Sequence, residues 1–219
     1  FLTIYTDWVE FTAIKTVYSF TPKKFTLKLE DTGTAYFREL YTIYYGASVI
    51  GTFDNIPRPG FLDPNLVKIK LDNSINYCHD VYLVVKDLIE DFQLIFKNFS
   101  RLDYAIDFQA LPGFKSVQSF LQGIASGNIR MKGKQTEVYK EAVTYQYDLK
   151  LWRDCDEITG VAFGKRISGL RTSIYNKTKE LRRQKDKPYI REAWAQRQGY
   201  DSSKDVYRLE FSVKKPRWE

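Results

Sequence analysis

Histidine and cysteine are nearly absent from this sequence of 219 residues. The two cysteines, Cys78 and Cys155, are far apart and have no partners at metal-ligand spacing, which argues against a disulfide framework or a zinc finger. The single histidine, His79, excludes any mechanism that needs two. We therefore expect a protein of a reducing compartment, the cytoplasm.

Long apolar runs are also missing. No stretch approaches the roughly 18 to 20 apolar residues that a membrane helix requires. The first residues contain no apolar segment followed by the small-residue cleavage site of a signal peptide. We expect no membrane partner, and the 43 % hydrophobic and 28 % charged residues are typical of a globular protein.

Basic residues are in excess, and they are unevenly distributed. Lys and Arg number 34 against 27 Asp and Glu, a net charge of +7. Residues 1–110 carry 11 basic and 14 acidic side chains, whereas residues 111–219 carry 23 and 13. A basic half indicates a polyanionic partner, although a solvated surface that keeps the protein soluble explains the same excess.

Alternating β-branched and aromatic residues dominate the chain and predict a protein rich in strands. We expect strands over residues 2–14, 24–30, 35–45, 48–53, 66–71, 101–108, 136–151, 158–164, 170–176 and 205–214, with a proline-rich loop over 55–64.

The clearest helix is predicted to start at a cap, Asn73 or Ser74, and to continue to Phe99, because apolar residues recur at helical spacing. Shorter helices are expected over 115–125, 177–183 and 189–197. Together these elements predict one α+β domain over residues 1–219. Its antiparallel β-sheet has five or more strands, with helices packed on one face.

Three of the expected strands place charged side chains on one face, because successive residues of a strand point to opposite faces. The residues concerned are Arg101, Asp103 and Asp107 in the first strand, Arg171, Ser173, Tyr175 and Lys177 in the second, and Arg208 and Glu210 in the third. If the three strands are neighbours, clustered carboxylates suit Mg²⁺ or Mn²⁺. An ordinary half-buried sheet with a wet, charged face explains the same pattern.

These segments resemble a family. Residues 160–168 (Gly-Val-Ala-Phe-Gly-Lys-Arg-Ile-Ser), 170–180 (Leu-Arg-Thr-Ser-Ile-Tyr-Asn-Lys-Thr-Lys-Glu) and 206–210 (Val-Tyr-Arg-Leu-Glu) are similar to a motif series of the Rep_trans family. That family comprises rolling-circle replication initiators of the staphylococcal plasmid type and related relaxases of integrative conjugative elements. The strand at 101–107 and the opening segment 6–12 also resemble the family pattern. The chain ends directly after the last expected strand, so we expect a C-terminal part of the family pattern to lie outside it.

The resemblance implies a metal-dependent enzyme that nicks and rejoins DNA. In such an enzyme a tyrosine attacks one strand of origin DNA, forming a 5′-phosphotyrosyl link and freeing a 3′-OH. A tyrosine hydroxyl with a pKa of about 10 needs a base, a metal or a cation to become a good nucleophile. The partners implied are double-stranded or cruciform origin DNA, a host helicase and a second copy in a homodimer, all in the bacterial cytoplasm.

Site residues follow from the resemblance and the strand faces. Tyr175 is the expected nucleophile, with Tyr189, Tyr200 and Tyr207 as rivals. The expected ligands of Mg²⁺ or Mn²⁺ are Asp107 and Glu210, with Asp103 as a third ligand or a partner to an arginine, and Asp7 as a weaker candidate. The expected DNA-binding residues are Arg101, Lys165, Arg166, Ser168, Arg171, Lys177, Lys179, Arg182, Arg183 and Arg208.

Other interpretations of the sequence stay open. A conjugative relaxase would use the same chemistry as a plasmid initiator, and the sequence does not separate the two. A nuclease in which water attacks would form no covalent intermediate. A non-catalytic basic protein that follows nucleic-acid phosphates would account for the charge alone.

Overall fold

The structure of the chain is a computed structural model, and it describes residues 1–17, 21–60, 62–78, 80–129, 150–154, 157–164, 169–183 and 187–214. The chain forms two compact units. Thr6–Asp103 make up the N-terminal unit, and Phe1–Tyr5 with Tyr104–Glu219 make up the C-terminal unit. Two long strands, β1 (Leu2–Lys15) and β6 (Leu94–Phe108), contribute residues to both units.

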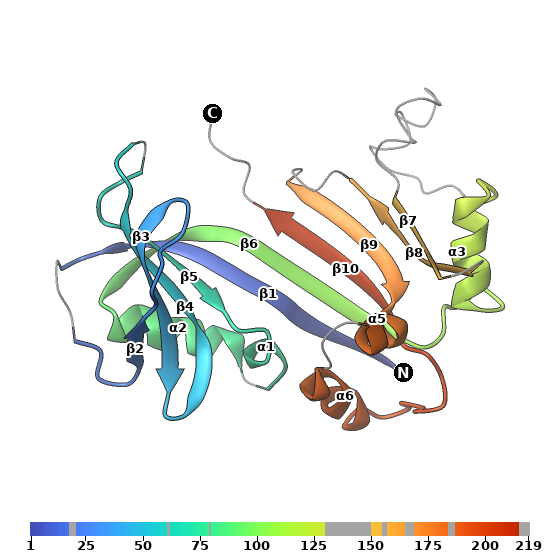
Figure 1. The fold of residues 1–219 in the computed structure, drawn as a ribbon. Coiled ribbons are helices and arrows are strands. Elements are labelled where there is room, and N and C mark those ends of the chain that lie inside the picture. Colours follow the sequence, from blue (N-terminus) through green and yellow to red (C-terminus); the bar gives the residue numbers. More distant parts are fainter. Residues whose placement is uncertain are drawn as a thin grey trace. The chain divides into compact units, whose positions relative to one another are not determined.

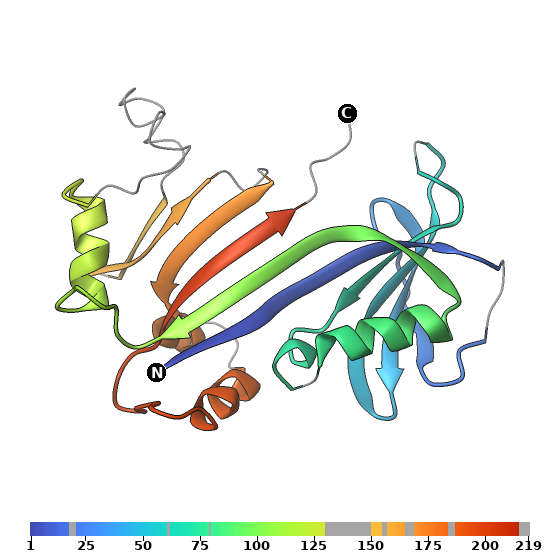
Figure 2. The ribbon, with the colours of Figure 1, turned by 180° about the vertical axis from the view of Figure 1, so that it is seen from behind.

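The N-terminal unit is an antiparallel sheet with the strand order β2-β3-β4-β5-β1-β6. Its other strands are β2 (Thr26–Leu29), β3 (Phe37–Tyr45), β4 (Ser48–Pro57) and β5 (Leu66–Leu71). Alternate residues of β1, namely Val9, Phe11 and Ala13, are buried because they face a shared core. Leu88 of α2 (Val81–Asp91) and Phe92, the residue directly after that helix, reach this core, and α2 follows the short α1 (Ile75–Cys78) (Figure 2).

The C-terminal unit continues the strand order as β6-β10-β9-β8-β7. Its strands are β7 (Lys150–Asp154), β8 (Glu157–Phe163), β9 (Leu170–Asn176) and β10 (Tyr207–Lys214), all visible in Figure 1. Strand β7 pairs with β8, β8 with β9 and β9 with β10, each time in antiparallel orientation. Helix α3 (Val117–Ala125) packs Leu121 and Ile124 into a core with Phe108, Ile174 and Tyr207.

Two further helices of the C-terminal unit lie between β9 and β10 in the chain. Helix α5 (Lys177–Arg183) begins where β9 ends, and α6 (Pro188–Ala195) follows it. Helix α6 buries Ile190, Ala193 and Trp194, which lie at helical spacing on one side of it. These two helices bring side chains toward the polar face of β9 and β10, as described below.

The α+β fold and its antiparallel sheet confirm the sequence prediction, and several elements match closely. The expected strand 170–176 and helix 177–183 have the predicted bounds, and the expected helix over 115–125 is α3. The predicted proline-rich loop is shorter than expected, because β4 continues through Asn55 to Pro57. Most of the strand expected over 136–151 lies outside the described residues, as does His79.

The long helix expected to run to Phe99 is wrong. Helix α2 starts at the cap residue Asp80 and ends at Asp91. Gln93 then has a φ of 52°, a left-handed conformation that ends the helix, and β6 begins at Leu94. Ile95 and Phe99 are therefore strand residues, since the run of apolar side chains suits either period over a short stretch. Within the described residues, no helix has the length and apolar composition to span a membrane.

Candidate functional site

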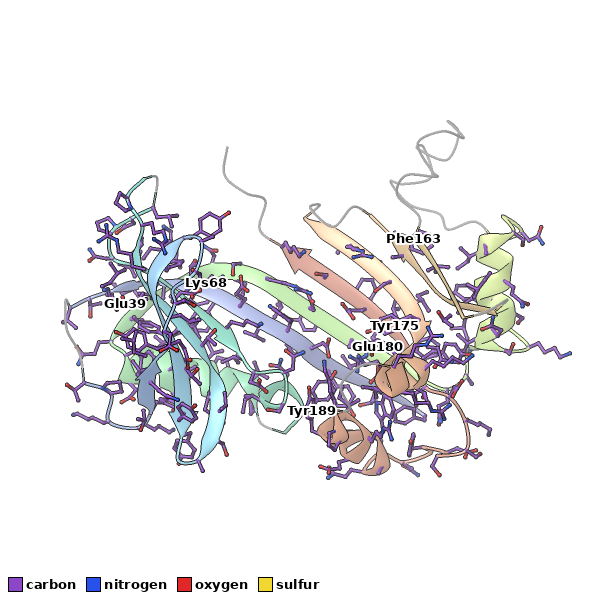
Figure 3. The ribbon with its side chains drawn as sticks, viewed as in Figure 1. Glu39, Lys68, Phe163, Tyr175, Glu180 and Tyr189 are labelled. Carbon is purple, nitrogen blue, oxygen red and sulfur yellow. The ribbon has the colours of Figure 1, made fainter. Side chains whose placement is uncertain are left out.

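The polar face predicted for β9 and β10 exists, and Tyr175 lies on it. Strand β10 pairs with β9 so that Arg208 stands opposite Tyr175 and Glu210 opposite Ser173. The Tyr175 hydroxyl donates a hydrogen bond to the Oε2 atom of Glu210, at 2.9 Å. The tyrosine is half-buried and lies at the end of β9 next to α5 (Figure 3). A carboxylate that accepts this proton is positioned to act as a general base.

Beside this pair, Arg208 is completely buried and holds Asp107 of β6. The Arg208 Nε atom donates to Oδ1 of Asp107 at 2.7 Å, and Nη2 donates to Oδ2 at 2.8 Å. The indole Nε1 of Trp194, on α6, donates to the same Oδ2 at 2.7 Å. The fully buried Asp107 therefore has a hydrogen-bond partner on each oxygen, and the pair fixes β10 and α6 against β6.

A cation lies close to the ring of Tyr175. The Lys177 ammonium is 5.6 Å from the centre of that ring, and the lysine is only 3 % exposed. It forms an ion pair with Glu180 of α5, at 2.5 Å. The backbone N–H groups of Lys177 and Thr178 both donate to the carbonyl of Val206, so the start of α5 is fixed next to the start of β10. The site thus combines a tyrosine, a carboxylate that accepts a hydrogen bond from its hydroxyl, and a buried ammonium.

The other cations predicted to bind DNA occupy different environments. Arg182 and Arg183 are exposed on α5, whereas Lys179 and Arg171 are half-buried. Arg101 belongs to the N-terminal unit, where it pairs with Asp103. The predictions for Lys165, Arg166 and Ser168 lie outside the described residues.

Each carboxylate predicted as a metal ligand accepts a hydrogen bond from a neighbouring side chain. Asp107 is held by Arg208 and Trp194, and Glu210 accepts from Tyr175. The buried Asp103 accepts hydrogen bonds from both Nε and Nη2 of Arg101, in the N-terminal unit.

Asp7, the weaker candidate, accepts a hydrogen bond from the Tyr77 hydroxyl, also in the N-terminal unit. Across the part of the chain that the structure describes, no group of three His, Cys, Asp or Glu residues is arranged to hold a metal ion. The role of these carboxylates as metal ligands therefore stays a prediction.

The three rival tyrosines, Tyr207, Tyr200 and Tyr189, lie in the following surroundings. Tyr207 is 9 % exposed and packs on the apolar face, 6.4 Å from Phe108 between ring centres. Tyr200 contacts the rings of Phe1 and Trp194. Tyr189 is half-buried in the first turn of α6. The Tyr175 hydroxyl donates to the Glu210 carboxylate, and its role as the nucleophile stays a prediction.

Sequence reasoning missed two residues of this arrangement, Trp194 and Glu180. Trp194 lies on the buried side of α6, and the helical spacing of Ile190, Ala193 and Trp194 is a signal that could have placed it inside. Its partner Asp107 is 87 residues away in the chain, and no local pattern indicates that contact. Glu180 is three residues after Lys177, a spacing that brings two side chains together on a helix.

Comparisons with known proteins support the fold. No family model and no curated protein matches the sequence. Among solved structures, the chain is similar to a rolling circle replication initiator protein from Geobacillus stearothermophilus, with a TM-score of 0.54 and 12 % sequence identity. The match covers 98 % of this chain and 75 % of that chain. At this identity the likeness shows a shared fold.

Proposed function

We propose that this protein nicks one strand of origin DNA through Tyr175 and so starts rolling-circle replication. Two independent lines support the proposal. The fold is similar to that of a rolling circle replication initiator, and the motif segments of the sequence resemble the initiator and relaxase family. The observation that carries it is the hydrogen bond from the Tyr175 hydroxyl to Glu210 on the neighbouring strand.

In the proposed reaction, the Tyr175 oxygen attacks the phosphorus of one phosphodiester while Glu210 accepts the phenolic proton. A bond forms between the tyrosine oxygen and phosphorus, and the bond from phosphorus to the 3′ oxygen breaks. The departing oxygen takes a proton from water. The products are a 5′-phosphotyrosyl link and a free 3′-OH, which a polymerase can extend. General-base assistance of this kind contributes about 10²–10⁴-fold to a rate.

Lys177 has two roles in the proposal. Its ammonium lies near the Tyr175 ring, where a positive charge favours the phenolate that forms during attack. The same charge offsets the negative charge that builds on the phosphate. The ion pair with Glu180 holds the ammonium in place when no DNA is bound.

Metal dependence stays a prediction of the sequence. The described carboxylates do not form a three-ligand cluster, and no step above passes through a metal ion. Metal dependence is tested by measuring nicking in the presence of excess chelator. Loss of nicking that added Mg²⁺ or Mn²⁺ restores would support the sequence prediction, whereas full activity with chelator present would contradict it.

The proposal is tested by covalent trapping. Wild-type protein incubated with supercoiled DNA that carries its origin should give a protein band shifted by attached DNA on a denaturing gel. Tyr175→Phe removes only the hydroxyl and should abolish the adduct. Glu210→Gln should slow adduct formation by about 10²–10⁴-fold while DNA affinity changes little, because the amide cannot accept the proton as a base.

Tyr189→Phe is the matched control, since it makes the same change at a half-buried tyrosine of the same unit. It should leave the adduct intact. A folded Tyr175→Phe protein that still becomes linked to DNA would refute the assignment. Nicked DNA without any covalent adduct would instead indicate attack by water.

A further inference from the structure

A cavity of about 550 Å³ lies in the C-terminal unit, and Tyr175 is not one of its lining residues. The loop from β6 to α3 and the segment that leads into β10 form two of its walls, and Arg182 of α5 and Tyr207 of β10 complete it. Tyr207 belongs to the apolar face that α3 covers. Arg208 and Glu210 alternate with Tyr207 along β10, so their side chains point to the face that carries Tyr175, whereas Tyr207 points to the apolar face.

The walls of the cavity are fixed by side-chain hydrogen bonds. Gln109 donates from Nε2 to the carbonyls of Asp201 and Lys204, at 2.6 and 3.0 Å. Its Oε1 atom accepts from the N–H of Asp201 at 3.0 Å, so this one side chain ties the β6–α3 loop to the segment before β10. The two segments run side by side in Figures 1 and 2.

The segment before β10 is further ordered by its own turn. Asp201 accepts hydrogen bonds from the Ser203 hydroxyl and N–H, and these bonds, with the Lys204 ammonium nearby, lower its pKa to about 2. Asp205 accepts from the buried Asn176 at 2.8 Å. A pocket that is formed before its ligand arrives binds without a large ordering cost.

The lining of the cavity is positively charged. Lys115, Arg182 and Lys204 line it, and Asp205 is the one carboxylate among its lining residues in the described part of the chain. Lys115 and Arg182 are exposed, while Lys204 pairs with Asp201 at 2.9 Å. The N-terminal end of α3 also reaches the cavity through Ser116 and Val117 and adds to the positive potential there. This charge favours an anion.

An aromatic ring shares the lining with these cations. Phe114 is 41 % exposed, and its ring packs edge-on against Phe120, at 4.8 Å between ring centres. Stacking between a base and an aromatic ring, with cations placed for the phosphate, is the usual way in which proteins bind single-stranded nucleic acid. A volume of 550 Å³ lies within the range of small-ligand pockets.

We propose that this cavity binds one unpaired nucleotide of a DNA strand, with the base against Phe114 and a phosphate between Lys115 and Arg182. The inference rests on the proposed function for the source of the nucleotide. The pocket would hold single-stranded DNA next to the start of β10, through residues that are not part of the Tyr175 site. A free mononucleotide offers the same chemistry, and the test below separates the two sources.

Binding is measured with a fluorescent single-stranded oligodeoxyadenylate on Tyr175→Phe protein, in which the proposed covalent step is removed. Phe114→Ala should weaken binding by at least about fivefold, because base stacking on an aromatic ring is worth roughly 1–3 kcal/mol. The double variant Lys115→Ala with Arg182→Ala should lower the slope of log affinity against log salt by about 0.7 for each phosphate that it no longer neutralises. Phe114→Tyr keeps a ring and should keep the affinity.

Matched controls come from the N-terminal unit. Phe99 is also 41 % exposed and also contacts a second phenylalanine edge-on, so Phe99→Ala makes a comparable change outside the cavity. Lys97 is exposed and serves as the charge control. Both controls should leave affinity and salt slope unchanged. Pocket variants that behave like these controls, in both affinity and salt slope, would overturn the proposal.

The two sources of the nucleotide are separated by competition. Deoxyadenosine monophosphate should displace the oligonucleotide only at concentrations at least about tenfold above those of unlabelled oligonucleotide. Equal potency would overturn the assignment to a DNA strand. The outcome is distinct from that of the adduct experiment, because Tyr175 can form its adduct whether or not this cavity binds a base, and the binding assay contains no covalent step.

Discussion

Inside the C-terminal unit, the Asp107 carboxylate accepts hydrogen bonds from Arg208 and from Trp194. Both members of the ion pair are fully buried. Asp107→Ala removes the carboxylate that faces the buried Arg208 guanidinium. We therefore expect this variant to lower the free energy of unfolding by about 3–5 kcal/mol, measured by chemical denaturation.

An exposed ion pair provides the comparison for this variant. Asp87 pairs with Lys24 on the surface of the N-terminal unit. Asp87→Ala should cost less than about 1 kcal/mol, because water solvates the lysine that remains. Equal decreases in stability for Asp87→Ala and Asp107→Ala would contradict the role assigned to the buried pair.

Asp54 should make stability depend on pH. Its side chain is 6 % exposed, with Oδ2 at 3.5 Å from Lys68, and burial raises its pKa above the usual value of 3.8. The folded state then binds the proton more tightly than the unfolded state does. This contribution to stability is present below pH 3.8 and is lost as the pH rises through the raised pKa.

Asp54→Asn removes that titration. Between pH 3.8 and neutral pH, the free energy of unfolding of the wild type should fall relative to that of the variant. Denaturation curves at a series of pH values measure the difference. Lys68 keeps a second acidic neighbour, Glu10, at 3.6 Å, so its charge is not left alone in the variant. A constant difference between the two proteins at every pH would contradict the expectation.

Residue positions that depend on strand alternation could be predicted from the sequence. Alternation predicts that Tyr175 and Arg171 share a face of β9 and that Arg208 and Glu210 share a face of β10. The register of β9 with β10 shows that these side chains lie on the same face of the sheet. The contact of Asp107 with Arg208 joins residues 101 positions apart. Only the folded arrangement brings them together, so no local pattern in the sequence indicates this ion pair.

At the scale of elements, the start of α2 depends on one side chain. Asp80 caps the helix, and its Oδ1 atom accepts from the N–H groups of Tyr82 and Leu83 at 2.9 and 3.4 Å. Asp80→Ala should lower the free energy of unfolding by about 1 kcal/mol, because those donors lose their acceptor. Asp80→Ser retains an acceptor and should cost clearly less. Equal decreases for the two variants, measured by thermal or chemical denaturation, would contradict the cap.

Elements with a strong local signal were predicted well, and the junction of α2 with β6 was not. The residue pattern of β9 is typical of a strand and that of α5 of a helix, and the pattern changes from one to the other at Lys177. Between Phe92 and Phe99, by contrast, apolar residues occur too often to select one period. The residue with the left-handed conformation is Gln93 and not a glycine, so the sequence carries no glycine signal for the end of the helix. The boundary between α2 and β6 is instead set by tertiary packing, because both Phe92 and Leu94 are buried in the core of the N-terminal unit.

At the scale of the whole molecule, the two units differ in charge. Lys and Arg number 23 and Asp and Glu 14 in the C-terminal unit, against 11 and 13 in the N-terminal unit. The basic half anticipated from the sequence therefore coincides with the unit that carries Tyr175. A positive unit attracts phosphate over the length of a Debye screening distance and makes DNA affinity salt-dependent.

Helix α5 should account for part of that dependence. The triple variant Lys179→Ala, Arg182→Ala and Arg183→Ala should weaken the binding of origin duplex and lower the salt slope by about 0.9 for each phosphate that it no longer neutralises. Replacing Lys86 and Lys97 of the N-terminal unit removes charge elsewhere and should leave the slope unchanged. If the triple variant keeps the affinity and slope of the wild type, α5 is a solvated basic helix.

Mass spectrometry of the trapped adduct identifies the residue that becomes linked to DNA, which we propose is Tyr175. The adduct is digested with protease and nuclease, and the peptide that retains a nucleotide is sequenced. We expect a peptide modified at Tyr175, in the segment Arg171 to Lys177, with the nucleotide joined through its 5′ phosphate. A nucleotide on Tyr189, Tyr200 or any other residue would contradict it.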